Sequence, residues 1–384
     1  MDVNTSASSK TRIMFQNHAA WLTGNKVHPL QVKPAPYTSP LEGQIVIRNY
    51  STAVNIVDGR LQDLGTSMMY KWIGYPCILG SDVAGEVVEV GPQVTRFKVG
   101  DRVVGHAVGK DEKRNNSAEG AFQLYVVLLD HMSSPIPDHM SYENACVLPL
   151  GTSTAACGLF VPEQLGLQLP SVNSKPKGET VLIWGGSTSV GSSAIQLAVR
   201  AGYEVFTTSS PHNFNYVRKL GAAKVFNYKS KTVVDDMVTA LKGKQVAGAI
   251  SMAHEGTKRC MDILARCDGK RFVSLAAYPV PDKLSAHFPI LQTMLLYITG
   301  NLVYWFKSKT MGVDYNLIFA TSLVENGVGK AIYGDYLPQA LEDGKLLASP
   351  EPVVVGNGLE SIQAALNYHK TKVSAKKVVV SLKD

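Results

Sequence analysis

The chain has 384 residues, of which 45% are hydrophobic and 18% are charged. This composition predicts a well-packed protein with two or three domains and excludes long disordered stretches. The net charge of +7 is spread without a run of five or six like charges, which argues against a nucleic-acid-binding protein. A mildly basic surface still suits an anionic cofactor or an acidic carrier partner.

The first 150 residues predict a barrel-like, all-β unit, because short apolar or alternating runs are separated by Gly, Pro and Asp. Strands are expected at 44–54, 83–91, 101–108 and 120–129. The pattern becomes helical at 141–160, and a loop rich in Pro, Ser and Lys follows at 170–178.

From residue 181 onward, strands and helices alternate, which predicts a parallel, doubly wound sheet with helices on both faces. The expected strands are 181–186, 203–210, 224–228, 247–253 and 271–277, and the expected helices are 189–202, 215–222, 233–242 and 257–267. A last helix, 359–370, with Leu359, Ile362 and Leu366 on one face, precedes a last strand, 376–382. We expect the first and last segments to form one domain that is interrupted by the second.

The apolar segment 288–306 approaches the length of a membrane span. Because Pro289, Gln292, Gly300 and Asn301 interrupt it, we expect a buried helix followed by a strand and no membrane span. Residues 302–307 are a candidate edge strand for a homodimer, or they line a long acyl pocket, so both monomer and homodimer stay open.

The turn after the strand 181–186 resembles a dinucleotide-binding G-x-G-x-x-G loop, except that Thr188 stands in place of the middle glycine. Gly186 permits the tight turn, and Gly191 lets the following helix pack close to the sheet. The loop is therefore either a cofactor cradle, in which hydroxyl groups join the helix N-terminus in holding phosphate, or a plain strand-to-helix turn.

The next strand ends in residues 207–213, where NAD-selective folds carry an acidic residue for the ribose. Here Ser209, Ser210, His212 and Asn213 offer neutral donors and no carboxylate that would repel a 2′-phosphate. NADP(H) is therefore the expected cofactor, although His212 is also compatible with an ordinary solvated loop.

Several segments together resemble the medium-chain dehydrogenase/reductase superfamily, in chain order and over nearly the whole length: 53–61, 78–91, 99–105, 119–128, 148–155 and the cofactor loop. Within it, GGSTSVG combined with TSSPHNF (208–214) and the long loop at 167–181 is similar to fungal trans-acting enoyl reductases that serve iterative polyketide synthases. The resemblance implies an α/β fold, in which a GroES-like β-rich domain (1–154 and 311–384) is interrupted by a Rossmann domain (155–310).

The resemblance also implies which residues form the site. Arg60, which stands where the family usually has Lys, and Thr154 are expected to orient the nicotinamide or the substrate, although Thr154 is equally compatible with a hydroxyl bonded to its own helix. Tyr228 is alternatively a packing residue. The implied cofactor-binding residues are Val57, Asp58, Gly59, Arg60, Thr154, Ser187, Thr188, Ser189, Val190, Ser210, Pro211, His212, Asn213, Tyr228, Leu275, Ala276, Val373 and Ser374.

Zinc-dependent members of the superfamily hold catalytic metal with a His and a Glu at the positions that Ser81 and Asp82 occupy here. Residues 105–122, where a four-cysteine zinc lobe is normal, contain no Cys. We therefore expect neither zinc site, and His106 is expected to be a strand residue rather than a ligand. Without a Lewis acid, reduction of a polarised C=C bond is favoured over alcohol oxidation.

The sequence therefore predicts a zinc-free, NADPH-dependent enoyl reductase whose α,β-unsaturated polyketide thioester is carried by a carrier protein. Alternatives are a quinone or enone reductase, a non-catalytic NADPH-binding scaffold, and a pathway-specific ring-forming or redox step. Five single cysteines without a C-x-x-C pair, and an N-terminus without a signal-like apolar run, favour a cytoplasmic protein.

Overall fold

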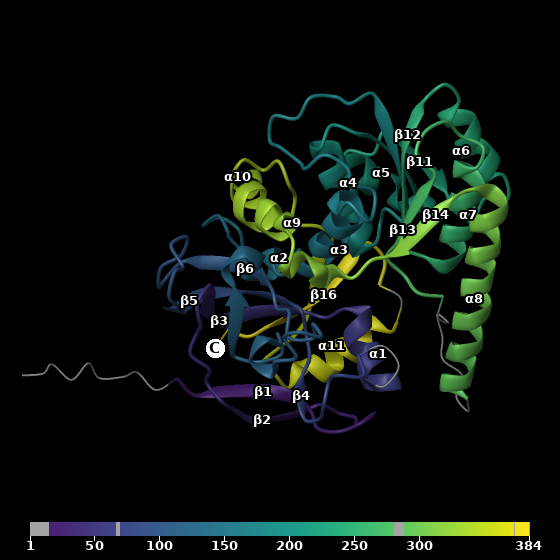
Figure 1. Cartoon of the computed structure of the whole chain (residues 1–384). Helices are drawn as coiled ribbons and strands as arrows, with labels where there is room; N and C mark the ends of the chain where they lie inside the picture. The colour runs from purple at the N-terminus through teal and green to yellow at the C-terminus, as the bar shows by residue number, and fades with distance from the viewer. Residues whose placement is uncertain (1–14, 67–69, 280–287, 372, 384) are drawn as a thin grey trace, which may run out of the picture.

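The computed structural model describes residues 15–66, 70–279, 288–371 and 373–383. The N-terminal segment 1–14, for which no signal peptide is expected, lies outside the described residues. The chain forms a β-rich lobe and a second lobe with a parallel sheet, and the last part of the chain returns to the β-rich lobe (Figure 1). The predicted fold class is therefore confirmed.

The β-rich lobe contains two sheets. The smaller sheet has the order β2-β1-β4, and the larger has the order β15-β16-β3-β5-β6-β8, with β7 also paired to β3. The C-terminal β16 pairs antiparallel with β3, which joins the first and last segments of the chain. The strand bounds are β1 Asn17–Leu22, β2 Gln31–Ala35, β3 Gln44–Ala53, β4 Cys77–Ile78, β5 Asp82–Val90, β6 Arg102–His106, β7 Tyr125–Leu129, β8 Ser133–Pro135, β15 Glu351–Asn357 and β16 Lys376–Ser381.

Two helices close this lobe, α1 (Ile56–Leu64) and α11 (Ser361–His369). Ile362 and Leu366 of α11 are buried in one cluster with Val378 and Val380, which alternate along β16. The predicted apolar face of the last helix is thus confirmed, because Leu359 is buried in the same cluster.

The second lobe is built on a six-stranded sheet of order β11-β10-β9-β12-β13-β14, in which all neighbouring strands are parallel. This is the 3-2-1-4-5-6 order of a doubly wound dinucleotide-binding fold. The strand bounds are β9 Glu179–Trp184, β10 Glu204–Ser209, β11 Lys224–Asn227, β12 Gln245–Ser251, β13 Phe272–Leu275 and β14 Asp314–Leu317. The edge strand β14 belongs to this sheet, although it begins after residue 310, where the Rossmann domain was predicted to end.

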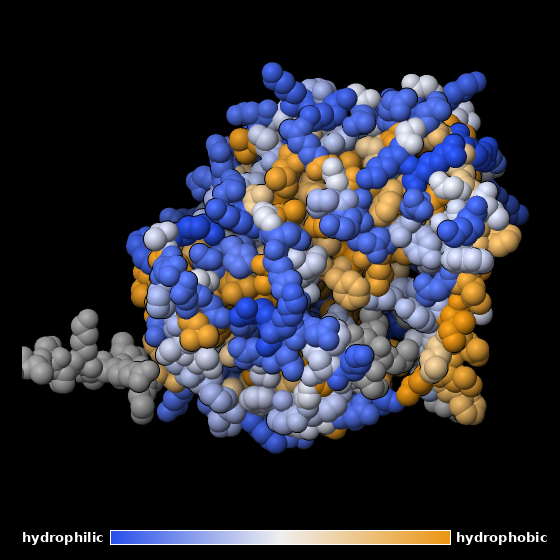
Figure 2. All heavy atoms as spheres, in the orientation of Figure 1, coloured by the Kyte–Doolittle hydropathy of each residue, from blue (hydrophilic) through white to orange (hydrophobic). Residues whose placement is uncertain are grey.

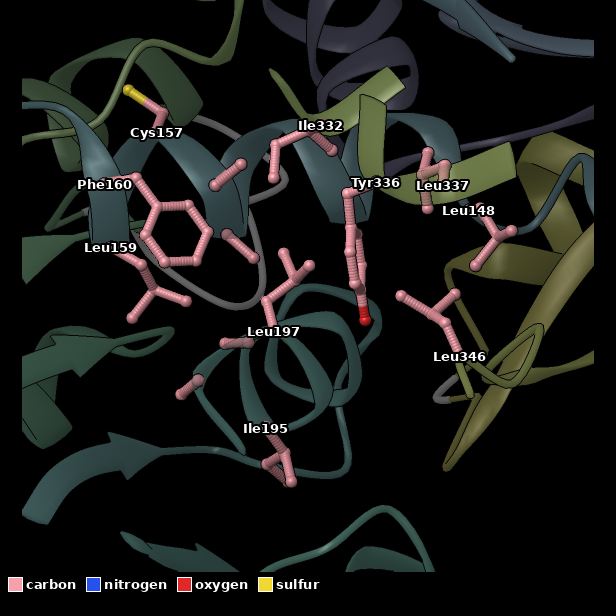
Figure 3. Close-up of a cluster of buried hydrophobic side chains, with 14 of the residues drawn as sticks. Leu148, Cys157, Leu159, Phe160, Ile195, Leu197, Ile332, Tyr336, Leu337 and Leu346 are labelled. Carbon is pink, nitrogen blue, oxygen red and sulfur yellow. The ribbon is translucent and has the colours of Figure 1, made fainter. Parts of the chain in front are cut away.

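Side chains of the central strand β9 alternate between two cores, as expected for a sheet covered on both faces. Val181 and Ile183 pack in the cluster on the side of α3 and α4, whereas Leu182 and Trp184 pack with residues of α6 and α7. Figure 3 shows part of the first cluster, in which the Tyr336 ring lies between Leu197 of α4 and Leu346. The α-helices are α2 Tyr142–Ala145, α3 Pro149–Phe160, α4 Ser189–Arg200, α5 Phe214–Lys219, α6 Val233–Leu241, α7 His254–Leu264, α9 Gly327–Gly329 and α10 Leu337–Glu342, and a π-helical segment spans Lys330–Tyr336.

The segment 288–306 differs from the prediction of a buried helix followed by a strand. It belongs to one 23-residue helix, α8 (Pro289–Met311), so the candidate edge strand at 302–307 is wrong. Gly300 does not interrupt the helix. A side chain at this position would collide with Pro279 and His254, so glycine is needed for the close approach of the helix to these residues. None of the helices in the described residues combines the length and apolar character of a membrane span.

Candidate functional site at the carboxyl edge of the parallel sheet

The glycine loop follows β9 at the carboxyl edge of the parallel sheet. A Cβ on Gly186 would lie 2.3 Å from Thr207 Oγ1, and one on Gly191 would lie 2.2 Å from the carbonyl oxygen of Gly185. Gly185 itself has φ +95°, a conformation that favours glycine. The close packing expected of Gly186 and Gly191 is therefore present in the structure.

Thr188, which replaces the middle glycine, is the N-cap of α4. Its Oγ1 accepts a hydrogen bond from the Gly191 N–H at 3.0 Å and donates one to the Gly185 carbonyl at 2.9 Å. A side chain at this position therefore stabilises the loop, because it satisfies one of the free N–H groups of the first turn.

The neighbours of Thr188 lie at the start of α4, where N–H groups and the helix dipole favour an anion. Ser187, Ser189 and Val190 are half-buried, and Thr188 is exposed. The Ser189 hydroxyl oxygen is buried and has no hydrogen-bond partner within the described residues. A buried hydroxyl without a partner at a helix N-terminus fits a phosphate-binding role.

The residues predicted to bind the 2′-phosphate come from two parts of the chain, the second lobe and the C-terminal segment. Ser374 Oγ lies 3.2 Å from His212 Nε2 and accepts a hydrogen bond from Asn213 Nδ2 at 3.0 Å. Ser210 Oγ donates to the hydroxyl of Tyr228 at 3.5 Å. These neutral donors therefore lie close together, and Pro211 is exposed beside them in the 3₁₀ turn Pro211–Asn213.

The other predicted cofactor-lining residues are near the same sheet edge or in the C-terminal segment. Leu275 ends β13 and is buried, and the Ala276 N–H donates to the Ser251 carbonyl at the end of β12, at 2.9 Å. Val373 is half-buried and precedes Ser374. Carboxyl ends of neighbouring parallel strands are where such folds bind their ligands.

Thr154 lies in α3 and is half-buried. Its hydroxyl donates to the Leu150 carbonyl, one helical turn earlier, at 2.7 Å. This is the bond that the alternative interpretation of Thr154 expects, and it leaves the hydroxyl oxygen free only as an acceptor.

The predicted nicotinamide-side residues Val57, Asp58, Gly59 and Arg60 are all in α1, and Asp58 is fully buried. The Asp58 carboxylate accepts the Asn55 N–H at 3.0 Å and pairs with Lys110 at 2.8 Å. Its charge is thus satisfied within the protein, while Val57 and Arg60 are half-buried at the surface of the helix.

A second buried ion pair lies near the first. Lys377 of β16 pairs with Asp82 of β5 at 2.9 Å, and the two side chains are 4% and 0% exposed. Asp82 also accepts hydrogen bonds from Asn55 Nδ2 at 2.8 Å and from the Leu150 N–H at 2.6 Å. We call Asp58, Lys110, Asp82, Lys377 and Asn55 the buried charge cluster.

His106 faces this cluster and is directly opposite Asp82 in the β5–β6 ladder. It is completely buried, and neither ring nitrogen has a hydrogen-bond partner within the described residues. Burial, together with the charges of Lys110 and Lys377, lowers the pKa of His106 to about 3. The ring is therefore neutral at physiological pH.

The side chains at the position of a catalytic zinc, Ser81 and Asp82, are already hydrogen-bonded to other groups of the protein. Ser81 Oγ accepts from Lys110 Nζ at 2.7 Å, and both oxygens of Asp82 have donors. No group of three or more His, Cys, Asp or Glu side chains within the described ranges is arranged to hold a metal ion. Because zinc needs several unprotonated N, S or O ligands, this donor set does not fit it.

The sequence prediction missed the two lysines and Asn55. Of these three residues, only Lys377 could have been found from the sequence. It lies two residues before the buried Val379 on β16, so the alternation of the strand places its charge on an inward face. Lys110 is in the long connection after β6, and no local pattern distinguishes it from a solvated lysine.

Tyr70 lies near Asp58 of the charge cluster, and Tyr278 lies near Tyr70. Burial and the charge of Asp58 raise the pKa of Tyr70 to about 12. Tyr278, two residues after Ala276, has ring-centroid distances of 6.2 Å to Tyr297 and 6.4 Å to Phe319. Burial, with further effects of Tyr70 and Tyr297, raises the pKa of Tyr278, so both hydroxyls stay protonated at neutral pH.

Comparisons with known proteins agree with this architecture. Residues 41–138 match the alcohol dehydrogenase GroES-like domain, and residues 189–311 match the zinc-binding dehydrogenase family. A dehydrogenase of Monascus ruber, pigH, is 52% identical over 96% of this chain and 100% of its own length. The trans-enoyl reductase himH of Aspergillus japonicus is 38% identical, with 95% of this chain and 97% of the relative covered.

Among solved structures, the CurK enoyl reductase has the same fold, with a TM-score of 0.71 and 22% identity over 96% of this chain and 100% of that chain. The sheet order, the glycine loop and the relatives agree with the resemblance carried by the sequence motifs. The chain belongs to the medium-chain dehydrogenase/reductase superfamily.

Proposed function

We propose that this oxidoreductase is a zinc-independent, NADPH-dependent enoyl reductase that acts on an α,β-unsaturated polyketide thioester. The single observation that carries the proposal is the buried charge cluster. The Lys110 ammonium group engages Ser81 and Asp58, and that of Lys377 engages Asp82. Ser81 and Asp82 occupy the positions at which metal-dependent relatives hold zinc. A site closed in this way favours a reaction that needs hydride transfer but no metal-bound alkoxide.

The residues that would hold NADPH lie along the carboxyl edge of the parallel sheet. Ser187, Thr188, Ser189 and Val190 would bind the pyrophosphate at the start of α4, and the neutral donors around Ser374 would bind the 2′-phosphate. When bound, NADPH supplies a hydride to the β-carbon of the substrate.

The protein's own residues would then position the substrate and exclude water. Arg60 and Thr154 are proposed orienting residues, while Val57, Asp58 and Gly59 shape the nicotinamide side and Leu275, Ala276 and Val373 line the remaining wall. Preorganised donors stabilise the enolate oxygen more than they stabilise the ground-state carbonyl, and this difference lowers the barrier. A proton reaching the α-carbon completes the saturated thioester.

We further propose a carrier protein of a polyketide synthase as the partner that delivers the thioester, in the cytoplasm. The name of the himH relative, trans-enoyl reductase, supports the partner. The location is supported by the five cysteines, all of which are unpaired thiols.

The proposal is tested by steady-state oxidation of NADPH with three substrates: an α,β-unsaturated pantetheine thioester, a small free enone and a quinone. We expect the highest kcat/KM with the thioester, and a further rise when it is attached to a carrier protein. Turnover of quinones without turnover of thioesters would instead identify a quinone reductase. Tight NADPH binding with no oxidation by any substrate would identify a non-catalytic binding protein or a different pathway step.

A further inference from the structure

Helix α8 carries an apolar surface that the proposed chemistry does not use. In Figure 2 hydrophobic side chains gather along the lower right edge, where Figure 1 places α8. Ten large apolar side chains of this fully described helix are between 38% and 60% exposed. Residues 288–306 contain no charged residue and no histidine.

The opposite face anchors the helix to the protein. Thr293, Gly300 and Tyr304 are its buried residues, and the Tyr304 hydroxyl bonds with His254. Gly300 lets the helix approach Pro279 closely. The exposed apolar face is therefore held in a fixed orientation on a long helix.

The exposed residues are not random in spacing. Leu291, Leu295, Ile298, Leu302 and Trp305 follow one another at intervals of four, three, four and three residues, and each is between 52% and 59% exposed. We call these five residues the α8 seam. A 4-3-4-3 spacing places side chains in one stripe and is the pattern by which one helix packs against another.

The size of the surface matches a protein interface. If each of the ten side chains exposes about 100 Å², half of what an aromatic side chain buries, α8 presents about 1,000 Å² of apolar area, of which the five residues of the α8 seam supply about half. Monomeric proteins rarely expose a patch larger than about 300–600 Å². A standard interface takes about 800 Å² from each partner.

We propose that the α8 seam is a dimer interface, in which α8 packs antiparallel against α8 of a second copy of this chain, with the twofold axis near Ile298. The seam is nearly symmetric about that residue, because Leu291 and Trp305 each lie seven positions away. An isologous contact requires such a self-complementary stripe.

Charge and shape favour the antiparallel arrangement. Lys309 continues the stripe four residues after Trp305 and is exposed, so a parallel pair would bring two Lys309 side chains together. An antiparallel pair separates them by about 30 Å along the helix axis. It also places the partner's Trp305 beside Leu291, where an open groove of about 440 Å³ is lined by Lys26 and apolar side chains of 288–294.

A membrane surface is less well matched. Interfacial helices have a polar face rich in Lys and Arg, whereas the face of α8 opposite the seam is buried against the protein.

The test measures the mass of the purified chain in solution by light scattering at micromolar concentrations. We expect twice the 41.5 kDa of the chain. The double variant Leu295→Glu, Leu302→Glu should weaken dimerisation by about a hundredfold or more, because two carboxylates from each protomer would be buried at the seam. The matched control Leu41→Glu, Val354→Glu, at side chains 71% and 50% exposed elsewhere, should stay dimeric.

Cysteine cross-linking tests the register. Ile298→Cys should form a disulfide-linked dimer under mild oxidation, whereas Leu291→Cys should not, because its neighbour is the partner's Trp305. Unchanged circular dichroism spectra and cooperative thermal unfolding show that the variants are folded, whereas loss of the dimer is itself expected to lower the melting temperature. A wild-type monomer, a dimer that survives the double glutamate variant, or a monomer that binds phosphatidylcholine vesicles through α8 would each overturn the proposal.

Discussion

The two parts of the candidate site differ in the charge, burial and pairing of their polar groups. At the start of α4 and around Ser374, which together form the cofactor side, the hydroxyl and amide groups are neutral, Thr188 and Ser374 are exposed, and the buried Ser189 hydroxyl is not paired within the described residues. In the buried charge cluster, two lysines and two aspartates are almost completely removed from water and paired with one another. The cofactor side keeps its donors for a ligand, whereas the cluster uses its charges for its own structure.

This difference has an energetic reason. A buried charge must be paired and hydrogen-bonded to be tolerated, so a cluster of this kind has little bonding capacity left for a metal or substrate. Neutral hydroxyl groups at a helix N-terminus cost much less to leave partly unsatisfied. Substitutions in the two parts should therefore affect different properties, namely stability in the cluster and cofactor affinity on the cofactor side.

The largest effect is expected from Lys377→Met. It leaves the Asp82 carboxylate buried without its cation, so the free energy of unfolding should fall by about 3–5 kcal/mol in urea titrations. The neighbouring Lys376→Met is the matched control, because Lys376 pairs with Glu351 at the surface. This variant should lose far less stability than Lys377→Met. Adding Asp82→Asn to Lys377→Met should restore part of the loss, and equal losses for the two lysines would contradict the contrast between the two parts.

His106 should make stability depend on pH. In the unfolded chain its pKa is near the ordinary 6.5, and in the folded protein it is about 3. Its contribution is therefore complete above pH 6.5 and is lost as the pH falls toward 3. The loss is about 1.4 kcal/mol per pH unit, or about 2 kcal/mol at pH 5.

The variant His106→Leu removes this dependence. The unfolding free energy of wild type relative to the variant should fall by about 2 kcal/mol between pH 7 and pH 5, measured by urea unfolding at each pH. His139→Gln, at an exposed histidine, should keep the wild-type profile. An unchanged profile in His106→Leu would show that burial beside the cluster does not hold the ring neutral.

On the cofactor side, Ser210→Asp should act on cofactor choice. A carboxylate beside the 2′-phosphate should weaken NADPH binding at least tenfold, about 1.4 kcal/mol, while NADH binding is retained or improved. Calorimetric titration of both cofactors measures this. Thr239→Asp, an exposed position on α6, adds the same charge and should leave the ratio unchanged. Equal NADPH and NADH affinities in the wild type would refute the predicted preference.

The smallest effect is expected at Thr188. Thr188→Val removes the N-cap hydrogen bond to Gly191 and should cost about 1 kcal/mol of stability. Thr188→Ser keeps the oxygen and should be close to wild type in thermal unfolding. A stable valine variant would mean that the hydroxyl is not needed to order the loop.

The contrast also explains how far the sequence predicts the structure. The parallel sheet and the glycine loop depend on contacts between residues that are close in the chain. The spacing of apolar residues and the turn-forming residues were therefore enough to predict them. The buried charge cluster joins residues from α1, β5, the connection after β6 and β16, and only Asp58 and Asp82 were identified, through their positions in motifs. In α8, Gly300 and Asn301 suggested an interruption, because a sequence does not show that Gly300 is needed for a close approach.

Zinc-independent hydride transfer is tested most directly by isotope transfer in protein stripped of metal by chelation. The enzyme is given NADPH deuterated at both C4 positions and an α,β-unsaturated pantetheine thioester. The product is analysed by mass spectrometry and NMR while the metal content is determined in parallel. We expect a saturated thioester with deuterium at the β-carbon and undiminished turnover without zinc. Absence of deuterium in the product, or activity that returns only when zinc is added, would show that the enzyme is not a metal-free enoyl reductase.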